Sequence, residues 1–264
     1  MNLAIDHETH YTYDAPVRGS TQYLRLTPRT SGRQRVLDWR IETPGNPVST
    51  LDGYGNVLHV LTLDKPVREI RVRATGSVET LAALDDSADP VALSPLVFTR
   101  ATVHTRPDEI LASFADGFRR RAATLSGLRE LAAAILRKMP FQPGETHVAS
   151  SAAEAFALGS GVCQDHAHVF IACCRALGVP ARYVSGYVYS PAHAGSHVAS
   201  HAWAEAWVVD RWRSVDIAND CPAGEMHVKL AIGADYFDAC PIRGTRLGGG
   251  AESMSTTAFV SAGQ

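Results

Sequence analysis

Residues 159–180 read GSGVCQDHAHVFIACCRALGVP, a helical segment with a cysteine in its first turn. The pattern predicts a helix from Cys163 to Leu177, because Gly178 stands at the position of a glycine cap and Pro180 follows just beyond it. Unpaired backbone N–H groups and the positive end of the helix dipole meet at such an N-terminus, and both favour a thiolate over a thiol. The same N–H groups can hydrogen-bond an oxyanion that forms on an attacked carbonyl. Cys163 is therefore a candidate nucleophile.

The chain beyond this helix reads as strands, and residues 200–207 are SHAWAEAW. A period of two places His201, Trp203 and Glu205 on one face and small alanines on the other. An aromatic ring on the face of a histidine can shield a Cys–His pair from water. We therefore expect His201 to be the base, and we assign Trp203, together with Gln164, to substrate binding or shielding.

Asp216 ends the next predicted strand. A two-residue turn is expected at Asp210-Arg211, and this turn sets Asp216 opposite Glu205. Asp216 then shares a face with His201 but lies too far along the strand to touch it, so a shifted register or a strong twist has to close the gap. A nucleophile on a helix, a base on a strand and an acid on the neighbouring strand form the pattern of a Cys–His–Asp triad.

The first hundred residues read as short strands separated by turns. Leu3, Ile5 and His7 begin a period-two pattern that continues to Tyr13. Further strand-forming runs are Gln22–Leu26, Val36–Ile41, Val57–Leu63 and Ile70–Ala74. The segment Ala82–Pro95 is rich in Ala, Asp, Ser and Pro, and we interpret it as a linker.

Helical patterns then replace the strands until the cysteine helix ends. A helix start is expected at Pro107-Asp108-Glu109, and two further helices are expected over Leu128–Met139 and Ala152–Leu158. The strands expected after the cysteine helix are Ala181–Tyr189, His201–Val209 and Trp212–Asp216, with one last strand after Gly250.

Together these stretches resemble the transglutaminase-like superfamily, whose members share a papain-like core. The matching residues are 143–146, 161–168, 178–187, 201–205 and 215–220. The last stretch departs from the more usual Asp-Pro-Thr-Asn by carrying Ile217 and Ala218, which leaves the acid intact and affects only the turn after it. The resemblance implies Cys163 as nucleophile, His201 as base and Asp216 as orienting acid.

The N-terminal stretch resembles the β domain that precedes this core in bacterial members, through Tyr11-Thr12-Tyr13 and Leu24–Arg29. The resulting expectation is an α+β chain of two domains. Residues 1–95 form an N-terminal β-sandwich-like domain with its linker. Residues 96–264 form a papain-like transglutaminase core, in which helices pack on an antiparallel sheet.

The implied chemistry is acyl transfer, in which a cysteine thiolate attacks an amide of a peptide or protein, a glutamine side chain being one such amide. Water as the acceptor gives a peptidase or amidase, and an amine gives a transglutaminase. We favour hydrolysis, because water is always present and the sequence shows no identifiable amine site. One rival is a metal site of Cys163, His166, His168 and His201, although position 168 points away from the helix face of 163 and 166. Another is a binding module that kept the fold without activity.

The amino-acid composition limits the partners and the cellular compartment that we expect. The 25 Lys and Arg nearly balance the 27 Asp and Glu, which predicts no nucleic-acid or membrane partner. No apolar run approaches the roughly 18 residues of a membrane span. An odd number of cysteines, five, and a start without a signal-peptide pattern predict reduced thiols and a cytoplasmic protein. We expect no cofactor and no metal, and the oligomeric state stays open.

Overall fold

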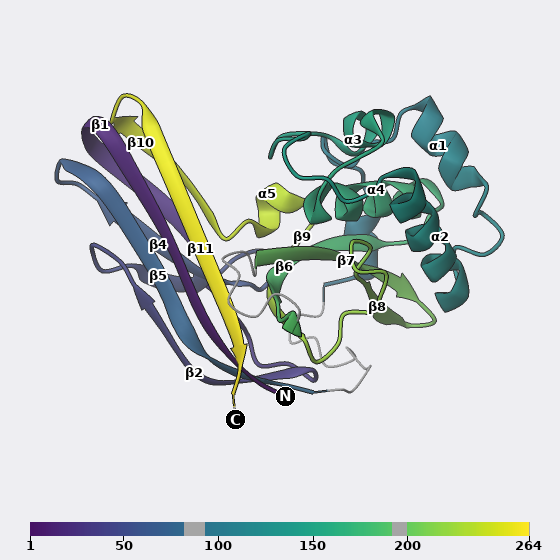
Figure 1. Ribbon diagram of the computed structural model, residues 1–264, viewed down its shortest axis with the longest axis horizontal. Coiled ribbons are helices and arrows are strands. Elements are labelled where there is room, and N and C mark those ends of the chain that lie inside the picture. Colours follow the sequence, from purple (N-terminus) through teal and green to yellow (C-terminus); the bar gives the residue numbers. More distant parts are fainter. Residues whose placement is uncertain (82–92, 192–199, 264) are drawn as a thin grey trace.

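The computed structural model describes residues 1–81, 93–191 and 200–263, which form a helical half and a sheet half (Figure 1). The helical half holds an antiparallel sheet in the order β8-β7-β6-β9. Its strands are β6 (Ala181–Val188), β7 (Ser200–Val208), β8 (Arg211–Val215) and β9 (His227–Gly233), and its helices are α1 (Glu109–Asp116), α2 (Leu125–Lys138), α3 (Ala152–Leu158) and α4 (Cys163–Ala176). Helix α4 packs on β6 and β7 and contacts the other three helices. This arrangement confirms the predicted core of helices on an antiparallel sheet.

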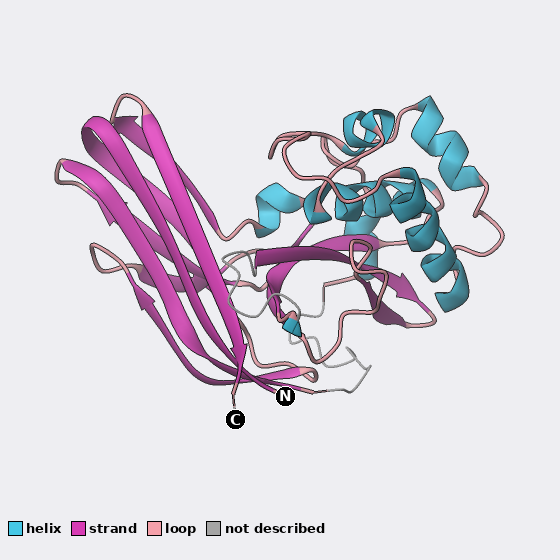
Figure 2. Cartoon of the chain, viewed as in Figure 1, coloured by secondary structure: helices cyan, strands magenta, loops and turns pink. Residues whose placement is uncertain are grey.

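The sheet half is built on β1 (Asn2–Thr27), one continuous strand of 26 residues. Leu3, Ile5, His7 and Thr9 are buried along one face, which confirms the period-two pattern. The first half of β1 pairs with β5 (Val67–Thr80) and the second half with β4 (Val57–Leu63), while β2 (Gln34–Glu42) and β3 (Val48–Leu51) extend the sheet. The strands form one long, curled sheet (Figure 2).

The other edge of β1 is covered by the C-terminal part of the chain. After the short helix α5 (Tyr236–Ala239), strand β10 (Ile242–Gly248) pairs with the second half of β1 and β11 (Glu252–Ala262) with the first half. The expected division placed these residues with the catalytic core, whereas here residues 242–262 complete the sheet that residues 2–80 begin. The physical reason is that an uncovered edge of so long a strand would leave a row of backbone N–H and C=O groups unpaired.

The two halves share one hydrophobic core. Leu3 of β1 and Val260 of β11 belong to the same buried cluster as Phe170 of α4 and Tyr187 of β6. The short 3₁₀ helix η1 (Pro95–Thr99) buries Phe98 on the far side of the four-stranded sheet, in a separate cluster. Among the described residues, no helix is long and apolar enough to cross a membrane.

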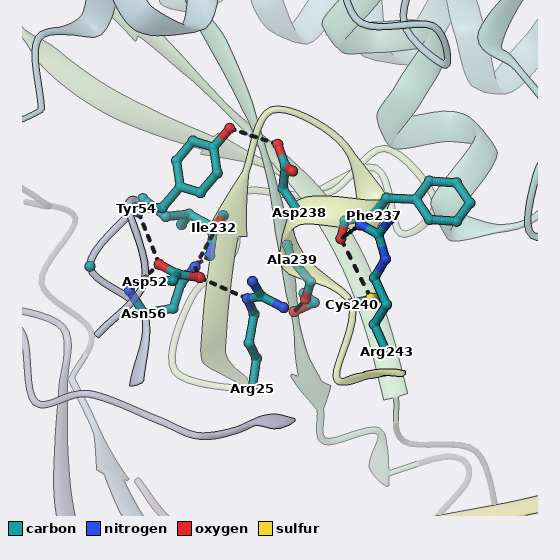
Figure 3. A network of polar contacts seen from close by, with 12 residues as sticks. Arg25, Asp52, Tyr54, Asn56, Ile232, Phe237, Asp238, Ala239, Cys240 and Arg243 are labelled. Carbon is teal, nitrogen blue, oxygen red and sulfur yellow. Dashed lines mark hydrogen bonds and ion pairs between the residues drawn. The ribbon is translucent and has the colours of Figure 1, made fainter. Parts of the chain in front are cut away.

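Two amide side chains of the sheet half pair with the free edge of β9. Asn56 donates from Nδ2 to the Ile232 carbonyl at 2.8 Å and accepts from the Ile232 N–H at 2.8 Å (Figure 3). Gln34 donates to the Lys229 carbonyl at 2.7 Å and accepts from the Lys229 N–H at 2.8 Å. These amides satisfy backbone groups as a further strand would, and they fix β9 against the sheet half.

Candidate active site

Cys163 is the first residue of α4, where the sequence predicted a helix start. Asp165 holds this start, because its carboxylate accepts from the Val162 N–H at 2.8 Å and from the Thr146 hydroxyl at 2.7 Å. The thiol is partly buried at the edge of the core. The backbone N–H of Cys163 lies in the first turn of the helix and so has no intrahelical acceptor.

The hairpin between β7 and β8 decides where Asp216 lies. Its two turn residues are Val209 and Asp210, with φ of 53° and 59°, which is the left-handed conformation of a type I′ turn. The turn predicted from sequence was wrong, since it was placed one residue later. The earlier turn moves the pairing by two residues, so that continuing the register sets Asp216 level with Trp203 and diagonal to His201. This shift closes the gap that the predicted register left open.

The structure brings the three predicted residues together. His201 Nε2 donates to Asp216 Oδ2 at 2.7 Å, and Cys163 lies near enough to the same ring to affect its pKa. Burial opposes a charge on the ring, but its interactions with Asp216 and Cys163 outweigh burial and raise the pKa of His201 to about 10. An imidazolium is therefore the stable form at neutral pH.

The Asp216 carboxylate is fully buried, and its Oδ2 accepts three hydrogen bonds. The donors are His201 at 2.7 Å, His227 Nε2 at 2.9 Å and Asn219 Nδ2 at 2.7 Å. Burial by itself would raise the pKa of Asp216, but these donors hold it well below its usual range. The site therefore keeps a permanent negative charge behind His201.

The turn after Asp216 forms despite its unusual residues. Asp216 and Cys221 exchange two backbone hydrogen bonds, of 2.8 and 3.1 Å, around the segment that carries Ile217 and Ala218. This turn brings the Asn219 side chain back to the carboxylate. The departure from the usual motif thus leaves the geometry around the acid intact.

His227 is a member of the site that the sequence analysis missed. It begins β9, a strand that was not predicted. Its Nδ1 accepts from the Gly224 N–H at 3.1 Å, so its proton lies on Nε2, the nitrogen that faces Asp216. Its ring packs edge-on against Trp203, with centroids 5.3 Å apart. The alternation of polar and apolar residues over residues 227–230 is a strand signal that could have revealed it.

The two residues assigned to substrate binding or shielding lie in different places. Trp203 is buried and stacks against His201, with centroids 6.3 Å apart, but it is outside the cavity that Cys163 lines. Gln164 lines that cavity and donates from Nε2 to the Val148 carbonyl at 2.9 Å.

The metal-ligand set considered from sequence is not brought together. His166 Nε2 lies 2.7 Å from the Met139 carbonyl, and His168 Nε2 accepts from the Tyr236 N–H at 3.1 Å, both within the core. Over the described part of the chain, the group whose ligand atoms could hold a metal ion consists of His201, Asp216 and His227, with those atoms within 4.8 Å of one another. Their hydrogen bonds already form a closed set around one carboxylate oxygen.

Cys163 and His201 open into a cavity of about 280 Å³ between the two halves of the molecule. Residues of both halves line it, among them Tyr183 and Tyr236 from the helical half and His7, Thr9, Tyr11, Met254 and Thr256 from the sheet half. Cys163 and His201 thus share one cavity with residues of β1 and β11. The cavity can admit a substrate group to the thiol and the imidazole.

Two family models match the chain on either side of the undescribed segment 82–92. Residues 3–79 match the bacterial transglutaminase-like N-terminal region, and residues 112–217 match the transglutaminase-like superfamily. An uncharacterized protein of Mycobacterium leprae is 31% identical over 96% of this chain and 95% of its own length. A second, from Mycobacterium tuberculosis, is 30% identical over 91% of this chain and 86% of its own length. The chain belongs to the transglutaminase-like superfamily.

A solved structure shares the whole fold. The crystal structure of a proposed cysteine protease from Cytophaga hutchinsonii covers 99% of this chain and 90% of its own, with a TM-score of 0.76 and 21% identity. This likeness confirms the α+β fold, with a β domain followed by a transglutaminase-like core.

Proposed function

We propose that this protein is a cysteine-dependent acyl-transfer enzyme that cleaves amide bonds of a peptide or protein. The observation that carries the proposal is that Cys163 and His201 line one cavity and that His201 is hydrogen-bonded to the buried Asp216. Each member has the partner that its role requires: the thiol has a base, and the base has a buried carboxylate.

The mechanism follows from these contacts. The Cys163 sulfur attacks the amide carbonyl carbon, and the carbonyl electron pair moves to oxygen, which the N–H groups at the start of α4 stabilise. The C–N bond then breaks, and the His201 imidazolium gives its proton to the leaving amine. Water attacks the thioester carbonyl carbon while His201 takes a proton from that water, and the C–S bond then breaks to release the carboxylic acid and return the Cys163 sulfur. An amine in place of water gives transamidation.

The other four thiols support this assignment because burial suppresses their ionisation. Burial raises the pKa of Cys173 to about 12 and that of Cys221 to about 11, and it also raises the pKa values of Cys174 and Cys240. Cys163 lies beside a histidine that is hydrogen-bonded to a buried carboxylate.

Labelling with limiting iodoacetamide near neutral pH, followed by peptide mapping, tests the proposal. We expect Cys163 to react at least about tenfold faster than any other thiol, and His201→Ala to abolish this advantage. Asp216→Asn should slow the reaction less than His201→Ala, since the amide is almost isosteric and can still orient the ring, and it should lower the melting temperature because the buried carboxylate accepts three hydrogen bonds. Preferential labelling of Cys221 or Cys240 would contradict the assignment.

A further inference from the structure

Strands that take no part in the proposed chemistry also line the cavity that Cys163 and His201 share. Tyr11 of β1 and Met254 and Thr256 of β11 belong to this lining. The size and polarity of these three side chains can select a substrate without changing the reaction.

Apart from His201, the described residues of this cavity offer no charged side chain to a substrate. Among the described residues that line it there is no lysine, arginine, aspartate or glutamate. The charge of His201 is balanced by the carboxylate of Asp216. His7 is buried and hydrogen-bonded to the Tyr187 hydroxyl at 2.7 Å, and burial lowers the pKa of His7 to about 4, so it is neutral at pH 7. A charged side chain would lose its water here without meeting an opposite charge.

The rest of the lining is mainly apolar, and the cavity is small. Tyr183, Tyr236, Ile242 and Met254 contribute aromatic and aliphatic surface. A volume of about 280 Å³ lies at the lower end for ligand pockets, so the cavity suits one side chain rather than an extended ligand.

Two hydroxyl groups add hydrogen-bonding capacity that carries no charge. The Oγ1 atoms of Thr9 and Thr256 lie 3.2 Å apart, and each lies 3.2 Å from His7 Nε2. We infer that the substrate places an uncharged side chain in this cavity, aromatic, long aliphatic or amide-bearing, and that Met254 helps to set this preference. The inference rests on the proposed function, because it concerns the substrate of the same site.

Four N-acetyl aminoacyl chloromethyl ketones test the inference as two matched pairs. Norleucine and lysine differ mainly in a terminal charge, as do glutamine and glutamate. In each reaction the Cys163 sulfur forms a C–S bond to the methylene carbon, and the C–Cl bond breaks to release chloride. The rate constant for labelling is measured by intact mass at pH 7. We expect the uncharged member of each pair to react at least about tenfold faster.

Charge variants of Met254 sharpen the test. This side chain lines the cavity but is 59% exposed, so a charged replacement is compatible with folding. Met254→Glu should raise the lysine-to-norleucine ratio of labelling rates at least about fivefold. Met254→Lys should raise the glutamate-to-glutamine ratio by a similar factor. Ser255→Glu and Ser255→Lys are the controls, because Ser255 is exposed on the opposite face of β11 and should leave both ratios unchanged.

The outcomes separate this inference from the proposed function. The inference is overturned if Cys163 is labelled rapidly but at equal rates within each reagent pair. It is also overturned if the Met254 and Ser255 variants change the rate ratios alike. In both cases the proposed function stands. Labelling of Cys163 that is slow with all four reagents and insensitive to His201→Ala overturns both.

Discussion

At the scale of single residues, the Asp216 carboxylate has one more imidazole than a triad requires. His227 donates to the same oxygen as His201, and Gly224 fixes the tautomer that makes this possible. His201 on β7 and His227 on β9 both donate to this carboxylate. Together they restrain its position and keep it ionised. In the proposed mechanism His227 is a positioning residue, one step removed from the reacting atoms.

Replacing His227 tests this role. A hydrogen bond to a charged group contributes about 1.5–3 kcal/mol, so His227→Leu should slow iodoacetamide labelling of Cys163 by about tenfold or more. His227→Gln keeps an N–H donor and should restore part of the rate. The rate constants of both variants are measured beside their melting temperatures. Wild-type labelling in the leucine variant would show that His227 only fills space.

Two other histidines predict sensitivity to acid. Burial lowers the pKa of His7 to about 4 and that of His168 to about 3, so both are neutral in the folded protein. In the unfolded chain they take up protons below about pH 6.5, so the free energy of unfolding falls as the pH drops from 6.5 toward 4. The lowered pKa of Asp216 acts only below its unfolded value of 3.8, outside this window.

His7 and His168 should each cost about 2 kcal/mol of stability between pH 7.5 and pH 5. Thermal unfolding at the two pH values measures this loss. His7→Gln should show a smaller difference between the two melting temperatures than the wild type. The exposed His147 provides the control, since His147→Gln should leave the difference unchanged. An unchanged difference in His7→Gln would refute the prediction for that residue.

At the scale of elements, β6 approaches its neighbours most closely at Gly186. A Cβ atom there would lie 2.2 Å from the Val228 carbonyl oxygen and 2.6 Å from the Trp203 ring. Because the Trp203 ring stacks against His201 and meets His227 edge-on, a displacement of Trp203 would reach both histidines. The absence of a side chain at this position therefore lets β6, β7 and β9 assemble the site.

Gly186→Ala should lower the free energy of unfolding by about 1–3 kcal/mol, as overpacking of a filled core does. It should also slow the labelling of Cys163 through the displaced tryptophan. Chemical denaturation and labelling rates measure the two effects. Gly53→Ala is a matched control, because no atom lies within 4 Å of the Cβ it would add. Equal stability of the two variants would contradict this account.

At the scale of the whole molecule, the sheet half supports the strand that carries His227. Asn56 and Gln34 pair with the backbone of β9 at Ile232 and Lys229, and no other described strand lies on that edge. Removing either amide leaves buried backbone groups unpaired, at a cost of about 1–3 kcal/mol. The two halves are thus coupled through β9 as well as through the shared core.

Asn56→Ala and Gln34→Ala should each lower the melting temperature and speed hydrogen–deuterium exchange in the peptide that contains β9. Exchange in α2, which lies away from this contact, should change less. The exposed Asn46 serves as control, and Asn46→Ala should leave both measurements unchanged. Unaltered exchange over residues 227–233 in both variants would show that β9 is held by β6 alone.

The sequence by itself determined the features that have local signals. The glycine cap and apolar spacing of residues 163–178 define α4 and place Cys163 at its start. Strict alternation defines the buried face of β1. Since the residue types of Cys163, His201 and Asp216 and their supporting elements are readable within short windows, the candidate triad could be predicted before any distance was known.

Tertiary structure alone decided how these elements meet. Val209 and Asp210 adopt positive φ, a conformation that such residues rarely take, so residue type did not reveal the register that brings Asp216 to His201. Strands β10 and β11 pair with β1 across more than 200 residues of chain, and no local pattern encodes so distant a partner. The contact of His227 with Asp216 and the cavity between the two halves exist only because those long-range pairings bury the remaining edges and faces of the sheets.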